Sequence, residues 1–238
     1  MRTALALLAF ACPAVALADA PAFHVDVPPG WVDLSPGAPE ANFARLPEEL
    51  VAQAKSGRFS QIAMDIDHAA DGFGENFNVV VTEGRLGRIS EGELDEIAAA
   101  VAGEMQKEAP GSSYRVVEKS VVVLGGAKSA RLVADFDMNG LKMRQMAYLV
   151  PGPKSHAAIT YTATPETFAA YRPAFEASAA SVKGAAEPGF DWGGALSRAG
   201  RSAAVGAVIG LVVALFGLAS RRRLKTKDLP APPTDPST

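Results

Sequence analysis

Hydrophobic and polar residues alternate along much of the chain with two different periods. Seven segments alternate with period two, which is typical of strands with one buried face. They are 23–27, 59–67, 77–83, 114–124, 128–138, 141–150 and 156–162. Gly125-Gly126 and Asn139-Gly140 separate the central segments, and both pairs fit two-residue hairpin turns. The pattern therefore predicts an antiparallel meander in the second half of the chain.

Three further segments have the helical period. They are a short helix at 47–55, a long helix at 90–109 that begins with a Ser90/Glu93 capping box, and a helix at 165–183 with Thr164 as its N-cap. The apolar faces of the two long helices are expected to hold Leu94, Ile97, Val101 and Met105, and Phe168, Tyr171, Phe175, Ala179 and Val182. We predict an α+β fold, an antiparallel sheet of roughly five to seven strands with two long helices packed on it.

The first 18 residues, MRTALALLAFACPAVALA, are mostly apolar and do not alternate with polar residues. A basic second residue precedes the apolar run, and residues 16–18 fit the small-residue pattern of a cleavage site, so we predict a signal peptide at 1–18 that is removed before Asp19. Cys12 is the only cysteine and lies inside this segment. The predicted mature chain thus has no thiol for a disulfide, a metal site or a nucleophile.

A second apolar segment lies near the C-terminus. Residues 202–219 include no charged side chain, and as a helix they would be about 27 Å long, close to the bilayer's hydrocarbon core of about 30 Å. A basic run follows, whereas only Arg198 and Arg201 come shortly before. Because basic residues favour the cytoplasmic side, we expect one transmembrane helix with the C-terminus in the cytoplasm. The residues that would set this topology are Arg221, Arg222, Arg223, Lys225 and Lys227.

Small residues recur every four positions in the predicted span and share one helix face; they are Ser202, Gly206, Gly210 and Ala214. Such a face lets two membrane helices approach closely. We expect self-association or pairing with a partner's span, and a plain anchor is the alternative. The predicted organisation is a signal peptide (1–18), an extracytoplasmic α+β domain (19–183), a Gly/Ala-rich linker (184–201), a transmembrane helix (202–219) and a basic, Pro-rich cytoplasmic tail (220–238).

Charge divides unevenly between these parts. Residues 19–197 carry 24 acidic and 15 basic side chains, a net charge of −9, whereas residues 221–238 carry a net charge of +3. An acidic domain does not favour nucleic acid or anionic lipid surfaces. We therefore expect no nucleic-acid partner, and the acidic domain suits a basic protein partner.

The order of the elements resembles a known family. An N-terminal strand runs into VPPGW, a capped helix and a long meander follow, and the sequence YTATPETFAAYRPAFEASAASVK closes the domain. Over residues 23–183 this order resembles the PsbP/DcrB-like fold family. The resemblance implies a mostly non-enzymatic domain that binds other proteins or lies in the periplasm or lumen. It carries over no functional residue, and it implies that Trp31, Tyr161, Phe168 and Phe175 are core positions.

One run, MDIDHAADGFGEN from residue 64, carries groups that could bind a metal: Asp65, Asp67, His68, Asp71 and Glu75. The calcium-loop pattern fails, because the fifth position counted from Asp65 is an alanine and the glycine stands eighth. We expect Asp65 and Asp67 to face solvent from a strand.

No other candidate chemistry stands out. His24, His68 and His156 are far apart in sequence, and the chain has no P-loop or GxGxxG motif. We expect no enzyme activity, cofactor or metal, and predict a single-pass membrane-anchored binding or assembly module. Its partner would be another envelope protein or a second copy. A periplasmic small-ligand binder with a pocket between sheet and helices is an alternative, and a hydrolase that uses the three histidines is another.

Overall fold

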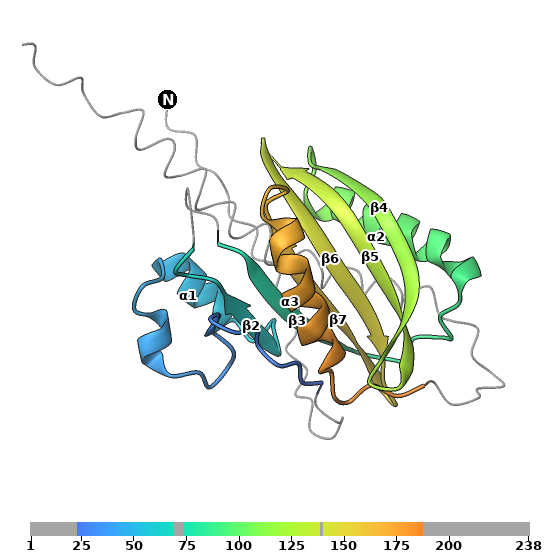
Figure 1. The fold of residues 1–238 in the computed structure, drawn as a ribbon, viewed down its shortest axis with the longest axis horizontal. Helices are drawn as coiled ribbons and strands as arrows, with labels where there is room; N and C mark the ends of the chain where they lie inside the picture. The colour runs from blue at the N-terminus through green and yellow to red at the C-terminus, as the bar shows by residue number, and fades with distance from the viewer. Residues whose placement is uncertain (1–22, 69–73, 139, 188–238) are drawn as a thin grey trace, which may run out of the picture.

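The computed structural model describes residues 23–68, 74–138 and 140–187 (Figure 1). These residues form a seven-stranded antiparallel sheet in the order β1-β2-β3-β7-β6-β5-β4. Its strands are β1 (Val32–Asp33), β2 (Gln61–Met64), β3 (Asn76–Glu83), β4 (Ser113–Leu124), β5 (Ala127–Met138), β6 (Leu141–Pro151) and β7 (Ser155–Ala163). The predicted α+β class and the predicted meander, β4 to β7, are confirmed.

Helices cover both faces of the sheet. The helical elements are η1 (Glu40–Phe43), α1 (Glu48–Ala54), η3 (Glu91–Glu93), α2 (Leu94–Glu108) and α3 (Phe168–Ala180). In Figure 1, α3 crosses the near side of the sheet and α2 lies behind it. The Ser90/Glu93 capping box forms as predicted, and the Ser90 backbone N–H donates to Glu93 Oε2 at 3.0 Å.

The core under α3 is aromatic. Phe175 is fully buried, and its ring contacts those of Trp31, Tyr161, Phe168 and Tyr171 at centroid distances of 5.0 to 6.1 Å. The predicted apolar face of α3 is therefore confirmed, as are three of the four core positions. Trp31 is only half-buried, because it covers the outer side of Phe175 and Tyr171.

Two apolar clusters occupy the opposite face. One joins Val101 and Met105 of α2 to Leu132, Phe136 and other residues of β5 and β6. The second joins residues near α1 and the start of α2 to Ile62, Leu149 and neighbouring positions of the sheet. The sheet is thus covered on both sides, which explains why nearly every position of β6 and β7 is buried.

The hairpin between β4 and β5 shows why glycine is required there. Gly125 and Gly126 both have positive φ, +54° and +84°. At Gly125 a Cβ would lie 2.8 Å from Ala185 Cβ and 2.9 Å from the Val182 carbonyl oxygen. The chain after α3 therefore passes directly over the turn, and only glycine leaves room for it.

Several predicted elements differ from the structure; the strand expected at 59–67, for example, is only Gln61–Met64. Residues 23–27 alternate in burial as expected, but they form only an isolated bridge, His24 with Lys183. The Gln61 side chain bonds both the Val25 N–H, at 2.7 Å, and the Val25 carbonyl, at 3.0 Å, in place of a neighbouring strand. The closing helix begins at Phe168 rather than Pro165, because a turn that Thr164 Oγ1 caps comes first.

Within the described ranges no helix is long and apolar enough to cross a membrane. The predicted signal peptide, transmembrane span and basic tail lie outside these ranges, together with Ser202, Gly206, Gly210, Ala214 and the basic residues from Arg221 to Lys227.

Candidate functional site

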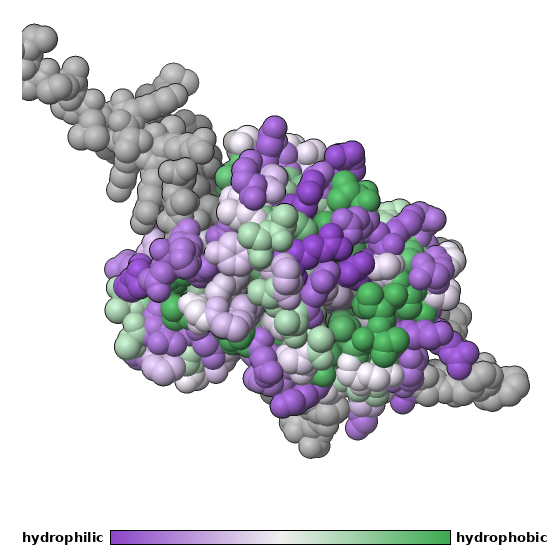
Figure 2. Space-filling model, in the orientation of Figure 1, coloured by the Kyte–Doolittle hydropathy of each residue, from purple (hydrophilic) through white to green (hydrophobic). Residues whose placement is uncertain are grey.

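The two edges of the sheet differ greatly. One edge is β1, which has two residues, and the other is β4, which has twelve. β4 carries the two large hydrophobic side chains that are exposed in the described part of the chain, Val117 at 39% and Val123 at 68%. Figure 2 shows hydrophobic surface gathered where β4 and β5 approach their hairpin. A long edge with exposed valines can pair with an additional strand.

The free edge of β4 is partly protected from strand pairing near its middle. A β-bulge between Val116 and Glu118 interrupts the register. The backbone N–H of Val121 points away from β5 and donates to Glu91 Oε1 at 3.3 Å, and Lys119 pairs with Asp95 of α2. Bulges and charges of this kind protect edge strands from unwanted pairing. Val123 lies beyond this protected stretch, towards the turn.

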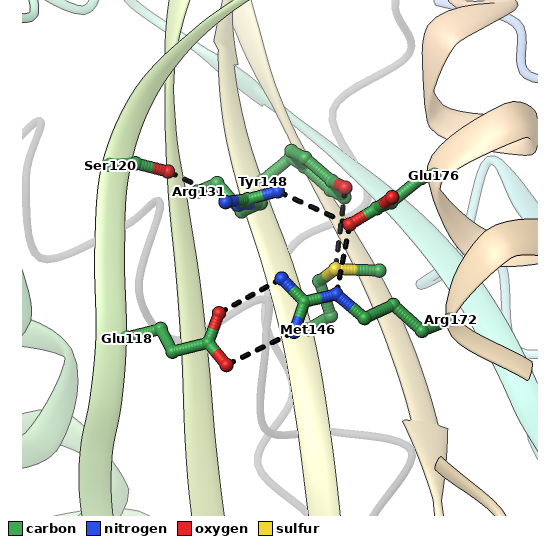
Figure 3. A network of polar contacts seen from close by, with 7 residues as sticks. All are labelled: Glu118, Ser120, Arg131, Met146, Tyr148, Arg172 and Glu176. Atoms are coloured by element: carbon green, nitrogen blue, oxygen red, sulfur yellow. Dashed lines mark hydrogen bonds and ion pairs between the residues drawn. The ribbon is translucent and has the colours of Figure 1, made fainter. Parts of the chain in front are cut away.

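A polar network on the near face ties β4 to α3 (Figure 3). Arg172 of α3 donates to both carboxylate oxygens of Glu118 at 3.0 and 2.9 Å, and its Nε donates to Glu176 at 3.0 Å. Arg131 bridges Glu176, at 3.2 Å, and Ser120, at 3.1 Å. The hydrogen bonds from Arg172 lower the pKa of the Glu118 carboxyl. Because these side chains are partly exposed, the network mainly fixes position and contributes little free energy.

A second polar cluster lies where β2 ends beneath α3, and it corrects one sequence prediction. Asp65 does not face solvent; it is 4% exposed and accepts a hydrogen bond from the Tyr171 hydroxyl at 2.6 Å. Burial alone would raise the pKa of Asp65, but the bonds from Tyr171 and His68 outweigh it and lower the pKa. The prediction failed because Tyr171, in the covering helix α3, is 106 residues further along the chain. Asp67 does face solvent and pairs with Arg45 at 2.6 Å.

Glu75 lies beside Asp65 in the pairing of β2 with β3, since the Asp65 N–H bonds the Glu75 carbonyl at 2.9 Å. Its carboxylate is 4% exposed and accepts a bond of 2.5 Å from Thr167. Each buried carboxylate thus has a hydroxyl donor from the α3 segment. In the described ranges no three His, Cys, Asp or Glu side chains gather closely enough to hold a metal ion, and Asp71 lies outside those ranges.

The three histidines have separate surroundings. His24 lies beside Asp26, at 3.7 Å, and His68 lies beside Asp65, at 3.0 Å. His156 is buried, its Nδ1 is 2.8 Å from the Gly84 carbonyl oxygen, and burial lowers its pKa. Each ring therefore has a partner of its own, and none of these contacts joins a histidine to a serine or to another histidine.

Sequence reasoning missed a group of buried amides and hydroxyls on the α2 side of the sheet. We call it the amide–hydroxyl array; its members are Asn76, Asn78, Gln145, Thr160 and Thr162, and none is more than 1% exposed. Among the described residues, five of their polar atoms have no hydrogen-bond partner: Asn76 Oδ1, both amide atoms of Asn78, Gln145 Oε1 and Thr160 Oγ1. The sequence carries one signal for this group, polar residues at alternate positions of a strand. A local pattern does not show, however, that both faces of that strand are covered.

No protein-family model matches this chain, and no curated protein matches it. Among solved structures, PsbP (CyanoP) from the cyanobacterium Synechocystis has 10% identity, a TM-score of 0.48 and coverage of 68% of this chain and 85% of its own. LpqN of Mycobacterium tuberculosis, which is involved in cell envelope biogenesis, has 15% identity, a TM-score of 0.41 and coverage of 68% and 82%.

A protein of unknown function from Pseudomonas aeruginosa has 14% identity and a TM-score of 0.35, with coverage of 45% of this chain and 71% of its own. A PsbP structure, of the family that the order of the elements resembles, is therefore among the solved structures similar to this chain. At these identities and TM-scores the similarities assign no residue, ligand or partner to this chain.

Proposed function

We propose that the chain is a non-enzymatic protein-binding module that a single C-terminal helix holds at the outer face of a membrane. The observation that supports it most directly is β4, a twelve-residue edge strand with exposed Val117 and Val123. The opposite edge offers two residues only. A partner would therefore add an extended segment beside β4, and its backbone would pair with the unpaired groups of that edge.

The charge of the domain supports one class of partner. The net charge of −9 over residues 19–197 favours association with a basic protein. The β4 edge near Val123 is apolar, so the added segment would be apolar towards the hairpin. The partner that fits is an envelope protein with an extended apolar segment and a basic surface around it.

The proposed anchor comes from the sequence. The apolar stretch at 202–219 follows the folded domain after a short Gly/Ala-rich linker, and the basic run from Arg221 to Lys227 follows the stretch. The linker of 184–201 would keep the end of the folded domain within about 65 Å of the bilayer, the greatest length of 18 extended residues. A partner within the same membrane, or close to its surface, is thus within reach.

Crosslinking in intact membranes tests this proposal. A photoreactive residue placed at Val123 is expected to yield one distinct crosslinked product besides the monomer. The same residue placed at Ala170, an exposed position on α3, is the matched control and should not give that product. A chain that is monomeric with both variants would contradict the proposal.

A charge at the edge gives a second test. With the photoreactive residue moved to Val117, the other exposed valine of β4, Val123→Lys places a protective charge where the partner strand would lie and should reduce recovery of the crosslinked product at least tenfold. Ala170→Lys adds the same charge to α3 and should leave recovery unchanged. Equal effects of the two substitutions would show that β4 is not the docking edge.

A further inference from the structure

The η3–α2 segment lies along the free edge of β4. Its Glu91 and Asp95 are about one helical turn apart, and they contact Val121 and Lys119, which are two residues apart on β4. One helical turn rises about 5.4 Å and two strand residues span about 6.6 Å, so the two segments run side by side in opposite directions. The capping box at the start of η3 fixes where this segment begins.

The backbone groups that β4 offers to an added strand alternate along it. Leu124 and Ala127 close a two-residue hairpin and bond each other. The N–H and C=O groups of Val123 and Val121 therefore point away from β5, as the bond from the Val121 N–H to Glu91 Oε1 shows. An added strand can use the Val121 N–H only after the Glu91 carboxylate has left it.

The contact of Glu91 with the edge is weak. The bond is 3.3 Å long, whereas hydrogen bonds to a charged group are typically about 2.7–2.9 Å. Glu91 is exposed and forms no ion pair within the described residues, because the nearby Lys119 pairs with Asp95. Little free energy thus holds the carboxylate against β4, but its negative charge stays beside any strand that displaces it.

This arrangement selects the charge of the segment that docks. A strand that takes the Val121 N–H places one side chain opposite Val121, beside the displaced carboxylate of Glu91. A Lys or Arg at that position would pair with the carboxylate, and an Asp or Glu would be repelled. Two positions along the added strand, on the same face, an apolar side chain would cover Val123, which is 68% exposed.

We propose that Glu91 is a displaceable cover of the Val121 N–H that selects the partner of the β4 edge. The partner's extended segment carries an apolar residue opposite Val123 and a Lys or Arg two positions away, opposite Val121. In the complex a carbonyl group of that segment accepts from the Val121 N–H, and the basic side chain pairs with Glu91. This role rests on the proposed function, because Glu91 controls the same edge, and it adds a specificity-determining residue outside β4.

Reversing the charge of Glu91 is the first test. In the full chain with the photoreactive residue at Val123, Glu91→Lys should reduce recovery of the crosslinked product from intact membranes at least tenfold, because like charges repel across an interface. Glu91→Gln should reduce it about two- to fivefold, the effect of one exposed ion pair. Glu48→Lys is the matched control and should leave recovery unchanged; Glu48 is exposed on α1, which lies far from β4 (Figure 1).

The outcomes of this test separate the two proposals. Recovery at the unsubstituted level with Glu91→Lys would overturn the role of Glu91 and leave β4 as the docking edge. Absence of the product from the chain without a substitution at Glu91 would contradict the proposed function, and the role of Glu91 with it.

The chemistry of the docked segment is the second test. Mass spectrometry of the product formed at Val123 identifies the partner residue that is attached there. A Lys or Arg should lie two residues from the attached residue. A segment with Asp or Glu at both such positions, or with no basic residue near the attachment, would overturn the proposed selection.

Hydrogen exchange in the purified full chain tests the cover itself. Glu91→Ala should speed exchange of the Val121 amide about two- to fivefold, the effect of one weak hydrogen bond. The Leu124 amide bonds Ala127 and is the internal control, so its exchange should not change. Unchanged exchange at Val121 would show that Glu91 does not cover this edge and would overturn the proposal.

Discussion

The aromatic core under α3 allows a quantitative prediction. Phe175→Ala removes a fully buried ring that contacts four other aromatic rings. Truncation of a buried Phe to Ala costs about 3–5 kcal/mol of unfolding free energy, and each aromatic pair contributes about 0.5–1.5 kcal/mol beyond its buried area. With several pairs lost together, the expected loss lies at the upper end, about 4–5 kcal/mol.

This loss can be measured by denaturant unfolding of the full chain in detergent. Tryptophan fluorescence is a suitable probe, because the Trp31 ring lies 5.8 Å from that of Phe175. In a thermal melt, a domain of this size loses about 2–4 °C of melting temperature per kcal/mol. The midpoint of thermal unfolding should therefore fall by roughly 8–20 °C. Val123→Ala, at an exposed position, is the control and should change the free energy by less than about 0.5 kcal/mol. A loss below about 1 kcal/mol for Phe175→Ala would refute the packing of α3 on the sheet.

Three further predictions concern pH, a turn and the membrane segment. Burial lowers the pKa of His156 in the folded state, so as the pH falls below the ordinary value of 6.5 the unfolded chain binds a proton before the folded chain does. The free energy of unfolding should therefore drop between pH 7 and pH 5. In denaturant unfolding, His156→Asn should make that drop smaller. Gly125→Ala should lower the free energy of unfolding by more than about 1 kcal/mol, because φ at Gly125 is positive and a Cβ there would lie too close to Ala185. The same substitution at Gly126, where a Cβ would meet nothing within 4 Å, should lower it by less in the same assay. Gly210→Ile should weaken association in a membrane dimerisation assay if the small-residue face packs against another helix, and unchanged association would contradict that packing.

Much of the fold follows from local sequence patterns. The period-two segments and glycine turns locate β4 to β7, and the capping box at Ser90 locates the start of the η3–α2 segment. These features depend on residues within a few positions of one another, so the chain itself carries the information. The strand order is harder to predict, since β3 pairs with β7 across more than seventy residues.

The polar sites depend on contacts that no local pattern contains. Asp65 is buried because α3 covers the end of β2, and Tyr171 comes from a segment 106 residues away. Asn78 and Thr160 alternate with apolar residues and look like solvent-facing positions of a strand. Only the cover on the second face of the sheet makes them buried and unpartnered.

The proposed function requires the folded domain to lie outside the membrane and the C-terminus to lie in the cytoplasm, and labelling of single cysteines tests this orientation. The predicted mature chain has no cysteine of its own, so Lys154→Cys, at an exposed position of the domain, and Ser237→Cys, in the predicted tail, each give a unique thiol. With a membrane-impermeant maleimide on intact spheroplasts, we expect Cys at position 154 to be labelled at once and Cys at position 237 to be labelled only after lysis. Labelling of position 237 in intact spheroplasts, with position 154 protected, would show the opposite orientation and rule out the proposed anchor.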